Sequence, residues 1–205
     1  ATAGQHPGSV TLDEAALRST RAGEFAAIRA ILRGTASRPA HFGCFGLHEW
    51  AMVYRQEAHR HEAPLRLGQQ GTDAVVEAHD IRCSHFDAYR FFTPEAAPRN
   101  RLTPTRENQP LLEQAGCLHA GMDLYKWAVK LGPLVPGETL LDTFELARDI
   151  RWLDMRASPY DVSSWGGEAV PIETPEGKAE YVRAQRGFTE RGQALRERLL
   201  VVLGA

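Results

Sequence analysis

The 205-residue chain has few cysteines, little lysine and no long uninterrupted run of apolar residues. Its three cysteines, Cys44, Cys83 and Cys117, are odd in number, widely spaced and without a Cys-x-x-Cys motif, so no disulfide framework is expected. No segment approaches the ~18 apolar residues that a membrane-spanning helix needs. These absences predict a protein of the reducing cytoplasm that does not associate with membranes.

Charge of neither sign dominates. The chain has 24 Lys and Arg residues against 26 Asp and Glu residues, a formal net charge of -2. The strongly basic domain or stripe that is typical of nucleic-acid binding is therefore missing from the overall composition. A hydrophobic content of 43% is enough for one globular core. We expect a flexible lead-in over residues 1–10 and a single domain over residues 11–205.

Hydrophobic periodicity predicts a mainly α-helical, bundle-like domain. Six segments have apolar residues at helical spacing, over about residues 12–33, 47–61, 85–92, 111–131, 138–156 and 175–202. Thr174-Pro175 is a typical helix start, with an N-cap followed by proline at the first helical position. Residues 65–83 change to a strand-like pattern around the glycines of residues 68–71, which predicts a small antiparallel β-hairpin inserted into the domain.

The stretch over residues 41–55 combines glycines, aromatic residues and a thiol directly before a predicted helix. His48 and Glu49 stand at the head of that helix, and His59 falls on the same helical face as His48. Such a face could bind a metal or transfer protons, or it could belong to an ordinary amphipathic helix. His48 and His59 are separated by about 16 Å of helix rise, so one ion cannot contact both.

Two further segments pair a histidine with a carboxylate. His85 and Asp87 begin one predicted helix, and His119 and Asp123 share a face of another. A spacing of four residues suits two ligands on adjacent turns, and facing helices with such ligands build metal sites in bundles. Zinc or non-haem iron suits this donor set. The alternative is that these residues form the solvated side of an amphipathic helix. The candidate metal ligands are His48, His85 and His119.

Arginines alternate with carboxylates over residues 145–161. Arg156 could hold an anionic group of a substrate while Asp154 or Asp161 accepts a proton. The alternative is an arginine–carboxylate mesh that stabilises the fold. Leu153 lies among these charges, so some of them are expected to turn inward, where a buried charge must be paired.

Aromatic residues are concentrated near the histidines. A flat ligand such as a nucleobase could stack on these rings, and core packing is the alternative explanation. The substrate-binding candidates are Trp50, Tyr54, Tyr89, Trp127 and Tyr160. Cys44, between Gly43 and Phe45, could be an activated thiolate or a buried structural thiol.

Five stretches of the chain, taken together, carry a resemblance to a known protein family. They are residues 41–55, 82–94, 116–127, 153–161 and 172–181. With motifs such as Leu153-Asp154-Met155-Arg156, they resemble a family of bacterial proteins commonly labelled 3-methyladenine DNA glycosylase. The resemblance covers most of the chain from about residue 25 onward. It implies hydrolysis of the N-glycosidic bond of a damaged purine, with DNA as the partner.

The chemistry that the resemblance implies needs a carboxylate and an aromatic ring. The carboxylate would steady or activate water at the sugar carbon, and the ring would hold a flipped base. Asp123, Asp87 or Asp161 could fill the first role, and Trp50 or Trp127 the second. The sequence has no helix-hairpin-helix glycosylase pattern.

Three functions remain open at this point. The resemblance favours a DNA glycosylase-like hydrolase. The first alternative is a His/carboxylate enzyme that uses zinc or iron on a small molecule, and the second is a non-catalytic ligand-binding domain. The candidate catalytic residues are Asp123, Asp87, Glu49, Asp161 and Arg156.

Overall fold

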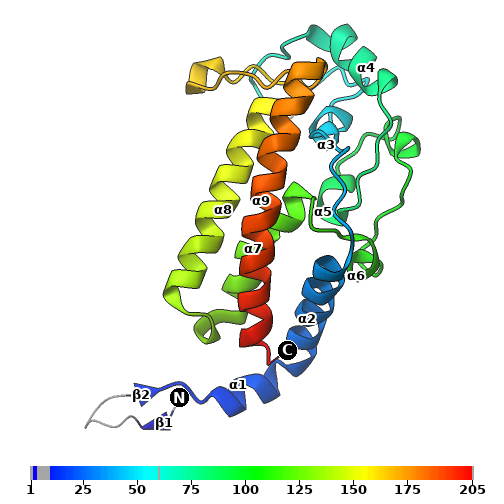
Figure 1. The fold of residues 1–205 in the computed structure, drawn as a ribbon. Helices are drawn as coiled ribbons and strands as arrows, with labels where there is room; N and C mark the ends of the chain where they lie inside the picture. Colours follow the sequence, from blue (N-terminus) through cyan, green and yellow to red (C-terminus); the bar gives the residue numbers. More distant parts are fainter. Residues whose placement is uncertain (1, 4–9, 60, 205) are drawn as a thin grey trace.

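The computed structural model describes residues 2–3, 10–59 and 61–204, and the chain is mainly α-helical as predicted. The four longest helices are α2 (Ala22–Ser37), α7 (Leu118–Leu131), α8 (Gly137–Ala157) and α9 (Pro175–Val202). Helices α7, α8 and α9 pack against one another, and α2 packs against α7 and α9 (Figure 1). Every helix in the described part of the chain is too short or too polar to serve as a membrane span.

Shorter elements cover the right side of this bundle in Figure 1. They are α3 (Leu47–Ala51), α4 (Gly68–Ala78), α5 (Phe86–Tyr89), η1 (Ala97–Arg99) and α6 (Gln109–Leu112). The other short elements are α1 (Glu14–Thr20), η2 (Gly132–Leu134) and η3 (Ser163–Trp165). Strands β1 (Thr2–Ala3) and β2 (Val10–Thr11) form a two-residue antiparallel pair.

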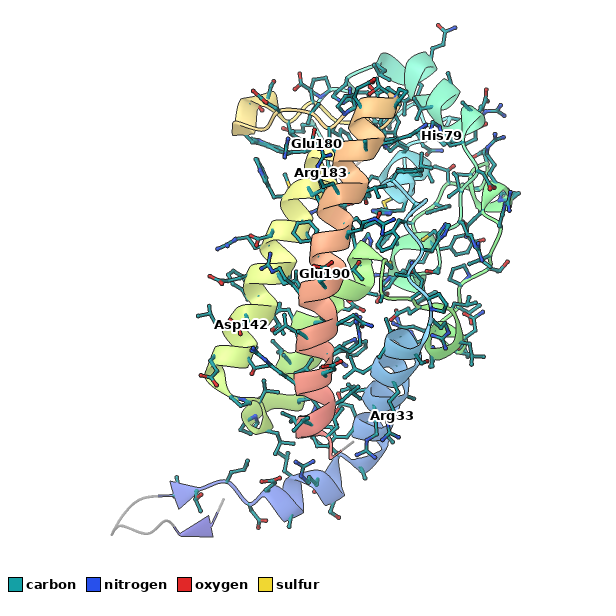
Figure 2. The ribbon with its side chains drawn as sticks, in the orientation of Figure 1. Arg33, His79, Asp142, Glu180, Arg183 and Glu190 are labelled. Atoms are coloured by element: carbon teal, nitrogen blue, oxygen red, sulfur yellow. The ribbon has the colours of Figure 1, made fainter. Side chains whose placement is uncertain are left out.

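The two longest helices follow their sequence predictions closely. The Thr174 hydroxyl accepts a hydrogen bond from the backbone nitrogen of Gly177 at 3.1 Å, and α9 spans the predicted residues 175–202. Helix α8 exceeds its predicted range by one residue at each end. Its buried side includes Leu146, Ile150, Leu153 and Ala157. Charged residues such as Arg33, Arg183 and Glu190 are exposed on the outer faces of α2 and α9 (Figure 2).

The helix predicted over residues 47–61 is wrong beyond Ala51. Trp50 and Tyr54 are both buried, together with the residues at 51 and 53, so this segment buries apolar groups on more than one side. An amphipathic helix with a single apolar stripe cannot do that, and the chain turns instead. Arg55 then adopts a left-handed backbone conformation with a φ of 55°. His59 therefore does not share a helical face with His48.

The hairpin predicted over residues 65–83 is also wrong, because α4 occupies most of that segment. Thr72, Val75 and Val76 are its buried residues, and their spacing of three and four is helical. Adjacent valines favour a strand locally, but packing overrides that preference. The bridges near the ends of the segment are isolated ones, Leu65 with Tyr160 and Ile81 with Asn100.

Three other predictions differ from the structure in their boundaries. The helix expected over residues 12–33 divides at Arg21 into α1 and α2, and the one over 85–92 shortens to α5. The helix over 111–131 starts only at Leu118, and the preceding loop carries Glu113 into the interior. Of the expected lead-in, residues 1 and 4–9 lie outside the described residues.

Candidate metal centre

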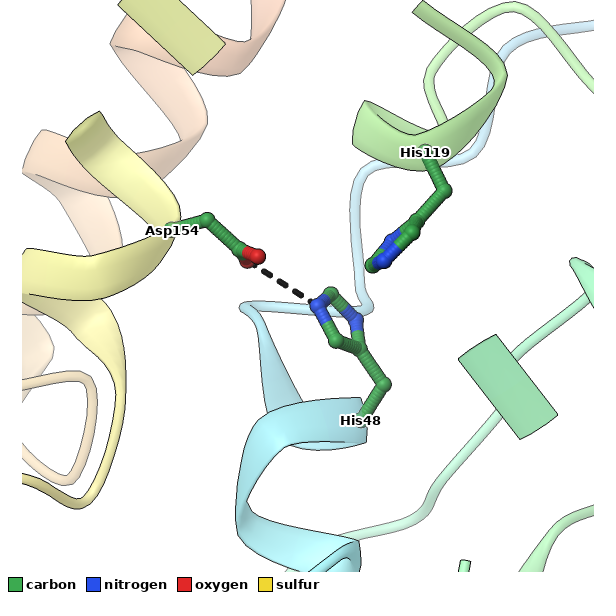
Figure 3. A group of neighbouring side chains, drawn as sticks. All are labelled: His48, His119 and Asp154. Carbon is green, nitrogen blue, oxygen red and sulfur yellow. Dashed lines mark hydrogen bonds and ion pairs between the residues drawn. The ribbon is translucent and has the colours of Figure 1, made fainter. Parts of the chain in front are cut away.

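Two histidines and one aspartate reach toward one another from three helices. His48 belongs to α3, His119 to the first turn of α7, and Asp154 to the last turn of α8 (Figure 3). His48 Nε2 lies 2.9 Å from Asp154 Oδ1. The His48 and His119 rings are 4.4 Å apart between centroids and nearly perpendicular, at 83°. One potential ligand atom from each of the three side chains lies within 4.8 Å of the other two.

Short local contacts fix α3, and with it His48, against the bundle. Trp50 Nε1 donates a hydrogen bond to the carbonyl oxygen of Ala157 at 2.9 Å, which attaches α3 to the end of α8 beside Asp154. Gly46 precedes α3 with a φ of 72°, a left-handed conformation that favours glycine. The other ring nitrogen of His48, Nδ1, lies 3.8 Å from Cys44 Sγ. The orientation of the buried imidazole is therefore set from both sides.

Asp154 is fully buried, and both of its oxygens have partners. Oδ1 faces His48, and Oδ2 accepts a hydrogen bond from Arg151 Nη1 at 3.2 Å. The same Arg151 nitrogen lies 3.1 Å from Glu49 Oε1. A carboxylate removed from water needs such partners to remain charged. Arg151 is only half-buried, so it connects the buried aspartate with the surface.

The electrostatics of the three side chains are linked. Burial lowers the pKa of His48, but the charge and hydrogen bond of Asp154 outweigh burial and hold this pKa well above its ordinary value. Burial raises the pKa of Asp154, but the charge of His48 brings it below its ordinary value. Burial and the charge of His48 together hold the pKa of His119 well below its ordinary value. His119 is therefore neutral near neutral pH, which is the form of imidazole that binds metals.

A second group of side chains, the ion-paired cluster, consists of His85, Glu113, Asp123 and Lys126. His85 Nε2 lies 3.1 Å from Glu113 Oε1 and 3.2 Å from Asp123 Oδ2. Burial lowers the pKa of His85, but the hydrogen bonds to Asp123 and Glu113 raise it to about 9. Lys126 Nζ contacts Asp123 and lies 3.3 Å from Asp87 Oδ2. Two cations thus balance the two carboxylates of this cluster without an added ion.

The two groups meet at His119. Its ring lies 5.3 Å from the His85 ring between centroids, at an angle of 35°. Nδ1 of His119 and Nδ1 of His85 are both buried and have no hydrogen-bond partner among the described residues. Buried polar atoms without a protein partner usually contact an ion or a water molecule. This favours a bound group beside His119.

A cavity of about 260 Å³ opens beside this centre. Its lining includes His119, Glu49, Asp87, Arg151, His61 and Tyr160. A smaller cavity of about 70 Å³ shares Glu49, His61, Arg151 and Tyr160 with it. Burial and the charge of Asp154 raise the pKa of Glu49 above its ordinary value. Ligand pockets in proteins typically have volumes of ~300–1,000 Å³. A cavity of about 260 Å³ lies just below this range, so it suits only a small molecule.

The structure brings together the three histidines predicted as metal ligands. Asp123 contacts His85, and Glu49, Asp87 and Tyr160 line the same cavity as His119. The predicted pairing of His119 with Asp123 as ligands of one ion does not form. The two residues point to different groups, because His119 joins His48 and Asp154 while Asp123 joins His85 and Glu113.

Four of the five aromatic residues predicted to bind substrate do not line the cavity. Trp50 and Tyr54 are buried in the core, where the Tyr54 hydroxyl donates a hydrogen bond to Glu77 at 2.8 Å. Tyr89 packs against Phe92, with 5.1 Å between ring centroids. The Trp127 ring is buried beneath the ammonium group of Lys126. Tyr160 is the member of the predicted set that lines the cavity.

Asp161 and Arg156, both predicted as catalytic residues, make contacts that hold a loop. Asp161 Oδ1 accepts a hydrogen bond from the backbone nitrogen of Ser163 at 2.9 Å. Arg156 donates to the carbonyl oxygen of Glu168 at 2.7 Å and pairs with Glu180 at 3.2 Å. The Arg156–Glu180 pair is a contact of the arginine–carboxylate type that was the alternative interpretation, whereas Asp161 accepts from a backbone nitrogen.

Sequence reasoning did not identify Asp154 as a ligand, nor did it find Arg151 and Glu113. Asp154 follows the buried Ile150 by four residues and Leu153 by one, so its place on an apolar stripe was a readable signal. Arg151 is one of several similar arginines along α8. Glu113 lies in a loop where no pattern indicates burial.

Comparison of the chain with models of protein families, with curated proteins and with solved structures gives no significant match. Two imidazoles and one carboxylate beside a cavity form a donor set that suits zinc or non-haem iron with open coordination positions.

Proposed function

We propose that the protein is a metal-dependent enzyme that acts on a small molecule, with His48, His119 and Asp154 as the metal ligands. The observation that carries this proposal is their convergence from three helices, with potential ligand atoms within 4.8 Å of one another. Convergence of polar groups from separate helices requires a benefit that offsets their burial. The ion pairs of Asp154 with His48 and Arg151 offset part of this cost. A shared metal ion would replace the proton that His48 carries in its pair with Asp154, and it would also engage the His119 ring, whose buried Nδ1 has no partner among the described residues.

The surroundings of the three side chains fit a catalytic metal better than a structural one. Structural zinc usually has four protein ligands, whereas catalytic zinc has three and keeps a position open. His119 lines a cavity of about 260 Å³, so a ligand could approach this position from outside. Arg151 holds Asp154 Oδ2 and leaves Oδ1 directed at His48. Such outer contacts orient metal ligands and tune their affinity.

When bound, a zinc or iron ion would act as a Lewis acid toward water or a substrate oxygen. The side chains of the cavity then have separate tasks. Glu49 lies next to His48 in sequence and lines the cavity, so it can accept or donate a proton at the substrate. Arg151 fixes the Glu49 carboxylate through its contact of 3.1 Å. Tyr160 lines the cavity beside His61 and can contact the substrate there.

Hydrolytic removal of a damaged base from DNA is the second candidate. It is supported by the family resemblance and by a cavity that combines the carboxylates Glu49 and Asp87 with the ring of Tyr160. In this alternative a carboxylate steadies water at the sugar carbon and Tyr160 packs against the base. Trp50 and Trp127 do not line this cavity, so Tyr160 is the aromatic candidate for that role.

Elemental analysis of the purified protein tests the first candidate. We expect close to one zinc or iron per chain in the wild type, and loss of that metal in His119→Ala. His79→Ala is the matched control, because His79 lies beyond α4 and outside both groups (Figure 2). A wild type that lacks metal after growth and refolding with zinc or iron would contradict the proposal.

An activity assay separates the two candidates. Release of 3-methyladenine from alkylated DNA by metal-free protein, abolished by Glu49→Gln, would favour the base-removing hydrolase. No release, together with stoichiometric metal, would favour the metal-dependent enzyme. Circular dichroism of each variant verifies that the helical fold is retained.

A further inference from the structure

Another cavity, of about 410 Å³, differs in the charge of its lining from the cavity beside His119. Its polar lining consists of Arg38, His41, Arg82, Ser84 and Gln114. None of the described residues that line it is an aspartate or a glutamate. A chain with a formal net charge of -2 thus has a cavity whose charged groups are all basic.

The two arginines of this cavity have no acidic partners within the described part of the chain. Arg38 donates to the carbonyl oxygens of Glu113, at 2.6 Å, and Pro110, which fixes the guanidinium group without neutralising it. Arg82 has neither a hydrogen bond nor an ion pair to any described residue. Most other arginines near a cavity here pair with a carboxylate, as Arg151 does with Glu49. An arginine held without a counter-charge is suited to an anion from outside.

The wall of the cavity is preorganised by Gln114. Its Oε1 accepts hydrogen bonds from the backbone nitrogens of His41 at 2.8 Å and Gly116 at 2.7 Å. These bonds join the loop before α3 to the loop before α7. Burial and the positive charge of Arg82 lower the pKa of His41, which agrees with a locally positive potential. Asp80, whose charge also reaches His41, is already paired with Arg101 at 2.5 Å.

The remaining wall is apolar and includes Leu102, Leu111 and Leu112. Leu111 is 70% exposed, so an apolar surface lies open beside the basic groups. We infer that this cavity binds a small oxyanion, a carboxylate or a phosphate group, that is carried on a compact apolar body. The arginines contact the oxyanion, and the leucines cover the apolar part.

This anion cavity is separate from the one beside Glu49. Between the anion cavity and His48 lies a space of about 10 Å³, lined also by Arg82, Ser84 and Gln114. A space of that size holds about one water molecule, so the anion does not contact the metal ligands. Binding of the anion therefore requires no metal, and this inference stands apart from the proposed function.

Titration of metal-free protein with phenyl phosphate and benzoate at constant ionic strength, followed by calorimetry, tests the inference. Inorganic phosphate and acetate serve as probes of the oxyanion alone. We expect saturable binding of one or both aromatic anions, and weaker binding of the matching inorganic or short anion. Whether phenyl phosphate or benzoate binds more tightly distinguishes a phosphate site from a carboxylate site.

Arg82→Gln and Arg33→Gln form a matched pair of variants. Each substitution replaces an exposed, positively charged arginine that has no ion pair with a described residue. Arg82 lines the cavity, whereas Arg33 lies on α2 outside it (Figure 2). Loss of one charged hydrogen bond should weaken binding about tenfold or more in Arg82→Gln. Arg33→Gln should bind as the wild type does. No saturable binding to the wild type, or equal weakening by both substitutions, would overturn the inference.

Discussion

Replacing Asp154 with asparagine should strongly destabilise the metal-free protein, although the two side chains have nearly the same size. The carboxylate is fully buried and receives bonds from His48 at 2.9 Å and Arg151 at 3.2 Å. Hydrogen bonds to charged groups contribute ~1.5–3 kcal/mol and neutral ones ~0.5–1.5 kcal/mol. Breaking a buried ion pair costs up to ~5 kcal/mol. We expect Asp154→Asn to lower the free energy of unfolding by ~2–4 kcal/mol.

Urea unfolding of metal-free protein at near-neutral pH, followed by far-ultraviolet circular dichroism, measures this change. Asp142→Asn is the matched control on the same helix (Figure 2). Asp142 pairs with Arg198 at 2.7 Å, but both side chains are about half exposed, at 45% and 54%. Exposed ion pairs contribute at most ~1 kcal/mol, so this control should change the unfolding midpoint little.

Equal midpoints for Asp154→Asn and Asp142→Asn, with unchanged denaturant dependence, would mean that the buried carboxylate carries no charge-specific stabilisation. The account of a paired, ionised Asp154 would then be wrong. A change in denaturant dependence in Asp154→Asn would instead indicate an altered compactness of the folded or unfolded state, and that experiment would be repeated with Asp154→Ala.

Three further predictions concern stability. Gly177→Ala should destabilise the protein by ~1–3 kcal/mol, because the new Cβ would overlap the carbonyl group of Pro171. Gly187→Ala on the same helix has open space around its Cβ and should stabilise the protein by ~0.5–1 kcal/mol. Chemical denaturation measures both changes. Burial raises the pKa of Asp149, but the hydrogen bond from Arg191 outweighs burial and lowers this pKa. The ionised carboxylate therefore stabilises the fold, so Asp149→Asn should lower the free energy of unfolding at neutral pH. This difference from the wild type should vanish as the pH falls through the carboxyl range. Zinc at about a hundredfold excess over its dissociation constant should stabilise the wild type by ~2.7 kcal/mol in thermal unfolding, and chelation should reverse this.

Local sequence signals were sufficient for the two longest helices, α8 and α9. Thr174-Pro175 marks the start of α9 by cap chemistry alone, and an apolar stripe marks α8. The segments that failed lie where tertiary packing decides. Val75 and Val76 favour a strand by propensity, yet they pack as part of a helical stripe. The segment around Trp50 and Tyr54 turns because more than one of its sides is buried, which periodicity cannot show.

The candidate site was predictable in part. His48, His85 and His119 were identified from their residue type and their proximity to carboxylates, and the structure places their rings in a row. The partners of each histidine were not predictable, because they depend on the orientation of α7 about its own axis relative to the neighbouring helices. That orientation places His119 near Asp154 and Asp123 near His85. Spacing along one helix shows which residues share a face, but not which neighbouring element each residue meets.

X-ray absorption at the zinc or iron edge of the wild-type protein tests the central claim most directly. For zinc, we expect only nitrogen and oxygen neighbours at ~2.0–2.2 Å, with imidazole scattering from two histidines and loss of the signal in Asp154→Asn. A sulfur neighbour at ~2.3 Å would instead indicate a thiolate such as Cys44, which lies 3.8 Å from His48 Nδ1. That result, or a metal site that is unchanged in Asp154→Asn, would contradict the assignment of His48, His119 and Asp154 as the ligands.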